Sequence, residues 1–157
     1  MGVEMKNQIK SDFFYETGIA QLGLKDFKGA IENFTKSIEL TQHNADAHFC
    51  RGLAKIHIND QEAAHQDLVK AESMNPNHEG THYQRALIKY ALKDYEGALK
   101  DFDLAIELNL YDAKAYVFRG LDKSNLEDED GAHADWISAT NLENDEANDL
   151  IKKYCLI

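Results

Sequence analysis

Apolar residues recur along this chain at helical spacing, and the whole pattern repeats every 34 residues. Rows of 34 aligned from Ser11, Ala45, Glu79 and Ala113 hold the same kind of side chain at the same position, or slot. Small residues fill slots 8 and 20, and bulky apolar residues fill slot 24. These slots read Gly18, Gly52, Ala86 and Gly120; Ala30, Ala64, Ala98 and Ala132; and Phe34, Leu68, Phe102 and Trp136. Small residues suit places where two helices approach closely, and bulky ones fill the gaps beside them.

Each row predicts two helices joined by a short polar break. The first helix covers roughly the first fourteen slots. The second carries small or apolar residues at slots 20, 24 and 27, which share one helical face. The breaks are Lys25-Asp26, Asn59-Asp60, Lys93-Asp94 and Glu127-Asp128. The only proline, Pro76, lies between the second and third rows, where a helix must end.

The period, the filled slots and the turn resemble the tetratricopeptide repeat (TPR) family. The resemblance implies an all-α fold, a right-handed TPR superhelix (α-solenoid) of four helix-turn-helix repeats. The repeats would be residues 11–44, 45–78, 79–112 and 113–146. Residues 147–157 continue in register and would form a C-terminal capping helix, because a solenoid otherwise ends on an exposed apolar face. Residues 1–10 would be an N-terminal leader that either frays or extends the first helix.

A longer period of 68 residues underlies the rows, since odd rows resemble odd rows and even rows resemble even ones. Slots 17, 21 and 28 are apolar in odd rows and polar in even rows. They read Phe27, Ile31 and Ile38, and Tyr95, Leu99 and Ile106, against Gln61, His65 and Glu72, and Glu129, His133 and Thr140. This pattern predicts a duplicated pair of repeats whose even second helices are either more exposed or differently packed. The histidines fit a polar outer face better than a pH switch.

A charge pattern follows the same rows. Slot 7 holds Thr17, Arg51, Arg85 and Arg119, and slot 23 holds Asn33, Asp67, Asp101 and Asp135. Where the arginine is missing, the aspartate is missing too. We therefore predict Arg–Asp pairs that brace the two helices of a repeat, or one repeat against its neighbour.

Composition excludes several classes of function. The chain has 157 residues, with 28 acidic against 17 basic residues and a net charge of −11. This balance disfavours nucleic acid and anionic membrane surfaces as partners. No apolar run is long enough to span a membrane, and the start lacks the apolar core of a secretory signal. Two cysteines, Cys50 and Cys155, show no disulfide or nucleophile pattern. We expect a cytoplasmic protein without a cofactor.

Residues 78–82 read HEGTH and match the zinc-peptidase pattern H-E-x-x-H. Both histidines must lie on one regular helix to hold zinc. His78 instead follows Asn75-Pro76-Asn77 at a repeat boundary, and no third ligand is suitably placed. His82 also shares its slot with Phe14, His48 and Tyr116, a place for a wide ring. We interpret the match as coincidental and predict no metal site and no enzyme. A weak adventitious site from His48, His78 and His82 remains an alternative.

The resemblance implies that slots 5, 9 and 12 of the first helices face a concave groove that binds partners. In the first three rows these slots are apolar or aromatic: Tyr15, Ile19 and Leu22; Phe49, Leu53 and Ile56; and Tyr83, Leu87 and Tyr90. We predict a non-enzymatic interaction scaffold or adaptor that binds an apolar or aromatic peptide or helix there. Some of these side chains could instead only pack helix on helix, and self-assembly through the same groove is a second alternative.

The groove does not match the TPR domains that clamp the terminal carboxylate of chaperone tails. The resemblance would require lysine, arginine and asparagine in slots where this chain has Tyr15, Ile19, Cys50, Gly80 and Gln84. A register shifted by one repeat also fails. We therefore expect no binding of chaperone tails.

Overall fold

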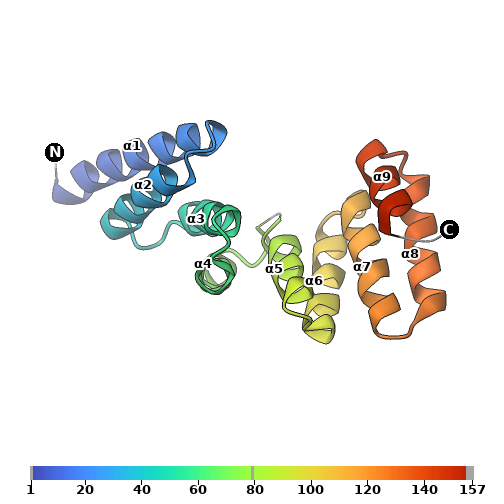
Figure 1. Cartoon of the computed structure of the whole chain (residues 1–157). Coiled ribbons are helices and arrows are strands. Elements are labelled where there is room, and N and C mark those ends of the chain that lie inside the picture. The colour runs from blue at the N-terminus through green and yellow to red at the C-terminus, as the bar shows by residue number, and fades with distance from the viewer. Residues whose placement is uncertain (1, 79, 155–157) are drawn as a thin grey trace. The chain divides into compact units, whose positions relative to one another are not determined.

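The structure is a computed structural model that describes residues 2–78 and 80–154. These residues form nine α-helices and no strand. The helices are α1 (Val3–Gly23), α2 (Phe27–Leu40), α3 (Ala45–His57), α4 (Gln61–Met74), α5 (Thr81–Ala91), α6 (Tyr95–Leu108), α7 (Ala113–Asn125), α8 (Glu129–Asn141) and α9 (Asp145–Tyr154). The chain divides into two compact units, Met1–His78 with α1–α4 and Glu79–Ile157 with α5–α9 (Figure 1).

The polar breaks of the sequence form the turn inside each repeat. The aspartate of each break caps the second helix, because its side chain accepts a hydrogen bond from the backbone N–H three residues later. The caps are Asp26 to Gly29 at 3.1 Å, Asp60 to Ala63 at 3.3 Å, Asp94 to Gly97 at 3.1 Å and Asp128 to Gly131 at 3.0 Å. The residue before each aspartate has a positive φ, which reverses the chain.

In the first unit, each helix packs against the next one along the chain. The core contains Ala30, Phe34 and Ala54. Gly18 lets α1 approach α2 closely, since a Cβ there would lie 2.7 Å from Cε1 of Phe34. Residues 3–10 belong to α1, so the part of the leader that the structure describes extends the first helix.

In the second unit, α5 to α8 pack in the same consecutive order, and α9 contacts both α7 and α8 (Figure 1). Ala147 and Ile151 of α9 are buried in one cluster with Val117 and Trp136. The helix predicted to cap the array is therefore present. Cys155, with the last residues of the chain, lies outside the described residues.

The difference between odd and even second helices is visible in the second unit. Tyr95 and Leu99 of α6 are partly buried and Ile106 is buried, whereas Glu129 and His133 of α8 are exposed. In α4 of the first unit, the polar counterparts are only half-buried. No described helix combines the length and the apolar character needed to cross a membrane.

Candidate functional site

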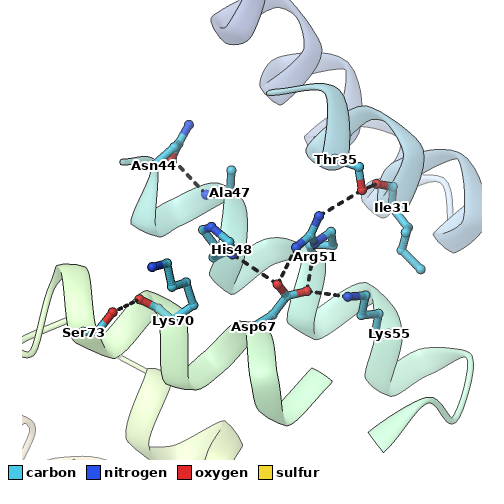
Figure 2. A network of polar contacts seen from close by, with 10 residues as sticks. All are labelled: Ile31, Thr35, Asn44, Ala47, His48, Arg51, Lys55, Asp67, Lys70 and Ser73. Carbon is cyan, nitrogen blue, oxygen red and sulfur yellow. Dashed lines mark hydrogen bonds and ion pairs between the residues drawn. The ribbon is translucent and has the colours of Figure 1, made fainter. Parts of the chain in front are cut away.

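The predicted Arg–Asp pairs form buried charge networks, and Figure 2 shows the one in the first unit. Arg51 of α3 donates from Nε and Nη2 to the two carboxylate oxygens of Asp67 on α4, at 2.8 and 2.6 Å. Lys55 Nζ lies 2.7 Å and His48 Nδ1 3.1 Å from the same carboxylate. Burial alone would raise the pKa of Asp67, but hydrogen bonds from His48, Arg51 and Lys55 outweigh it and hold the pKa well below its usual value.

The same network recurs twice in the second unit. Arg85 Nε donates to Asp101 at 2.8 Å, and Lys89 Nζ lies 2.8 Å from the same side chain. The carboxylate of Asp135 accepts hydrogen bonds from Arg119 Nε at 2.9 Å and from Arg119 Nη2 at 2.6 Å. Lys123 Nζ lies 2.9 Å from the same carboxylate. The predicted Arg–Asp pairs are confirmed within the second, third and fourth repeats.

The alternative, in which these aspartates pair with an arginine of the neighbouring repeat, is not what the three networks show; two of the arginines reach the preceding repeat through a different residue. Arg51 Nη1 donates to Thr35 Oγ1 of α2 at 3.1 Å, and Arg119 Nη1 donates to Asp103 of α6 at 2.8 Å. Each of these arginines therefore joins three helices, the two of its own repeat and the second helix of the repeat before it.

The first repeat replaces this network with a neutral one, in which Asn33 Nδ2 donates to Gln21 Oε1 at 2.7 Å. We did not predict the lysines of the other three networks, although the rows indicate them. Slot 11 reads Gln21, Lys55, Lys89 and Lys123, with the same exception in the first row as slots 7 and 23. These lysines and arginines are thus neutralised by aspartates of their own repeats.

In the first unit, the predicted binding residues lie on the neighbouring helices α1 and α3. Tyr15, Leu22, Phe49, Leu53 and Ile56 are all partly buried. Tyr15 and Leu22 also pack against the core of the unit, as the helix-packing alternative expected. The sixth residue, Ile19, is 37% exposed and gives α1 a solvent-facing apolar side chain.

Cys50 lies beside this face, with its Sγ 4.0 Å from the hydroxyl of Tyr15. Burial raises the pKa of the Cys50 thiol, which disfavours the thiolate that a nucleophile needs. The position therefore fits a structural thiol.

In the second unit, the predicted residues of α5 belong to an aromatic cluster with α6 and α7. The rings of Tyr83 and Tyr90 lie 6.4 and 6.3 Å from Phe118, and Phe102 stacks on Phe118 at 6.4 Å. Tyr83, Leu87 and Tyr90 are partly buried against this core. Phe118 was missed in the sequence, where its slot holds polar residues or cysteine in the other rows.

Tyr83 also lines a small cavity of about 150 Å³ in the second unit, next to Ala105 and Leu108. Gly80 and Asp112 form other parts of its wall. The cavity therefore adjoins a residue of the predicted binding face.

The HEGTH residues are divided by the start of a helix. Gly80 has a φ of 88° and is the N-cap of α5, so His78 lies outside the helix that contains His82. His78 belongs to the first unit, where its ring lies 4.4 Å from that of Phe49 and its Nε2 3.1 Å from Asp46. Glu79 lies outside the described residues. Among residues 2–78 and 80–154, no group of three or more His, Cys, Asp or Glu side chains is arranged to hold a metal ion.

Comparisons with known proteins identify the repeat. The family model described as "Tetratricopeptide repeat" matches residues 80–112. No curated protein matches the chain. Residues 80–112 are therefore a tetratricopeptide repeat, and the chain has the all-α fold of tetratricopeptide-repeat structures, as its slots and helix pairs predict.

Solved structures share this fold. A crystal structure of MamA is 21% identical and matches with a TM-score of 0.81, covering 88% of this chain and 81% of that one. MamA residues 41 to the end from Desulfovibrio magneticus RS-1 are 20% identical, with a TM-score of 0.78 over 85% of this chain and 75% of that one. The first TPR of Spaghetti (RPAP3), bound to the HSP90 peptide SRMEEVD, is 21% identical, with a TM-score of 0.74 over 76% of this chain and 95% of that one. At this identity the likeness concerns the fold.

Proposed function

We propose that this protein is a non-enzymatic interaction scaffold whose first helices bind an apolar or aromatic peptide, or a partner helix. The observation that carries the proposal is found in each unit by itself: apolar side chains on α1 and α3 of the first unit, and on α5 of the second, stay partly exposed although core positions beside them are filled. It is supported by a neighbour of the same fold that is bound to a peptide.

The chemistry of the face favours apolar contacts over charge recognition. Arg51 and Lys55 of α3 and Arg119 of α7 are held by buried aspartates and are not available to a partner's carboxylate. The acidic surface favours a partner that is neutral or basic outside its apolar segment. An acidic chaperone tail such as the SRMEEVD peptide of the structural neighbour does not fit this chemistry.

The test is selection of peptides from a random displayed library on the immobilised protein, followed by affinity measurement by calorimetry. We expect the selected peptides to carry apolar or aromatic residues. The substitutions Ile19→Ser and Leu53→Ser should each lower the affinity for these peptides about tenfold or more, which corresponds to about 1.4 kcal/mol. Tyr111→Ser is the matched control, because Tyr111 is 81% exposed on the turn before α7 and outside the predicted face.

Two outcomes would contradict the proposal. Selected peptides could depend on acidic residues or a free carboxyl terminus, or their affinity could be unchanged in both α1 and α3 variants. The self-assembly alternative predicts instead that the wild-type protein is larger than a monomer by light scattering and that Tyr83→Ala returns it to a monomer.

A further inference from the structure

Asp122 of α7 is a carboxyl group buried without a partner. Its side chain is 0% exposed, and neither carboxylate oxygen has a hydrogen-bond partner. The same slot holds Ala20, Ala54 and Ile88 in the other repeats, so this repeat has an acid where the others have an apolar side chain. Burying an unpaired carboxylate is costly, whereas a neutral carboxyl group is tolerated much more readily.

The charges around Asp122 do not compensate it. Asp94, the N-cap of α6, and Asp103 of α6 add negative charge close to it. The two cations next to it on α7, Arg119 and Lys123, are bound to Asp135 of α8.

Helices α5 and α9 also pack on α7, and their lysines do not neutralise Asp122. Lys89 of α5 is bound to Asp101. Lys152 and Lys153 of α9 are exposed to solvent. Burial, and then the two neighbouring aspartates, raise the pKa of Asp122 to about 7.

We propose that the protonation state of Asp122 controls how closely α6 and α7 pack against each other. With the carboxyl protonated, the two helices close over it. When it ionises, the carboxylate needs water, and the interface must loosen to admit it. The inference does not depend on the proposed peptide face.

The direction of the pH effect follows from proton binding. Between about pH 4 and 7, the folded protein keeps a proton on Asp122 that the unfolded chain has already released. The folded state is therefore destabilised as the pH rises through this range. Above the folded pKa both states are ionised, and the loss is complete. With the pKa moving from 3.8 to about 7, the contribution of Asp122 to the folding equilibrium constant should fall roughly 100-fold between pH 5 and 8.

Trp136 makes the experiment specific to the second unit. It is the only tryptophan, it lies on α8, and it is 7% exposed, so its fluorescence reports the unfolding of this unit. Urea unfolding between pH 5 and 9 should show a decline in stability with pH for the wild type. Asp122→Asn and Asp122→Ala, which copies Ala54, should remove most of it. Asp130→Asn is the matched control, because it removes the same charge from the exposed surface of α8.

A second measurement does not depend on the variants folding. Infrared spectra of the wild type should show the band of a protonated carboxyl at pH 6 that disappears by pH 9. The proposal is overturned if this band is absent at pH 6. It is equally overturned if folded Asp122 variants lose stability with pH as steeply as the wild type and Asp130→Asn.

Discussion

The charge networks make a quantitative prediction for Asp135. In Asp135→Asn, the side chain keeps its shape but no longer neutralises Arg119 and Lys123. Removing one partner of a buried ion pair costs about 3–5 kcal/mol, because the other charge is left uncompensated. The side chains of Arg119 and Lys123 are 17% and 20% exposed, and Arg119 keeps Asp103, so both cations retain some access to solvent or to an acid. We therefore expect Asp135→Asn to lower the free energy of unfolding by about 3 kcal/mol, the lower end of this range.

The first repeat provides the matched control. Its equivalent positions hold Thr17, Gln21 and Asn33, which are all neutral; Asn33 donates to Gln21, and Thr17 donates to the backbone of Phe13 on its own helix. The triple variant Arg119→Thr, Lys123→Gln and Asp135→Asn should recover most of the loss, to within about 1 kcal/mol of the wild type. A buried ion pair fixes packing geometry more than it adds net stability, so its complete removal is tolerated.

The assay is urea unfolding at pH 7, followed by the fluorescence of the neighbouring Trp136. The free energy of unfolding is obtained by linear extrapolation for the wild type, the single variant and the triple variant. A loss below about 1 kcal/mol in Asp135→Asn would refute the reasoning. So would a triple variant that is no more stable than the single one.

Three further predictions follow from other contacts. Folded Asp67 and Asp101 have lowered pKa values, so their contribution to stability should be lost progressively below about pH 5, which acid unfolding followed by circular dichroism checks. Gly120→Ala should cost about 1–3 kcal/mol in denaturant unfolding, because its Cβ would lie 2.3 Å from the indole nitrogen of Trp136. Gly52→Ala should be close to neutral, since its nearest contact would be 3.3 Å; equal losses would contradict the packing argument. Metal analysis of protein purified without chelator should show no stoichiometric zinc, and one equivalent that is lost in His78→Ala would contradict the interpretation of HEGTH.

The repeat, its turns and its Arg–Asp pairs could be predicted because they are periodic. Each aspartate cap and each Arg–Asp pair occurs at a fixed slot, and agreement between rows separates a structural requirement from chance. Even the exception at Thr17 and Asn33 was informative, since both members of the pair changed together. The HEGTH match could be placed at a repeat boundary for the same reason.

Features that belong to one repeat alone could not be predicted. Asp122 interrupts an otherwise apolar slot, and the sequence alone does not show whether such an acid is exposed, paired or buried. Phe118 also breaks its slot, and its role depends on rings from α5 and α6 that only packing brings together.

The predicted binding face has a different difficulty. Apolar residues such as Tyr83 and Leu22 both fill the core and line the surface beside it. Their residue type is the same in either role, so the helix-packing and binding interpretations differ only in how much of each side chain stays accessible. Ile19 is the residue for which exposure favours binding most clearly.

The most direct test of the account is to map a selected peptide on the protein by NMR of labelled methyl groups. The account predicts that the peptide shifts the methyl signals of Ile19, Leu53 and Ile56 on the first helices and leaves those of Val69 and Ile137 on the second helices unchanged. Shifts confined to Val69 and Ile137 would contradict it.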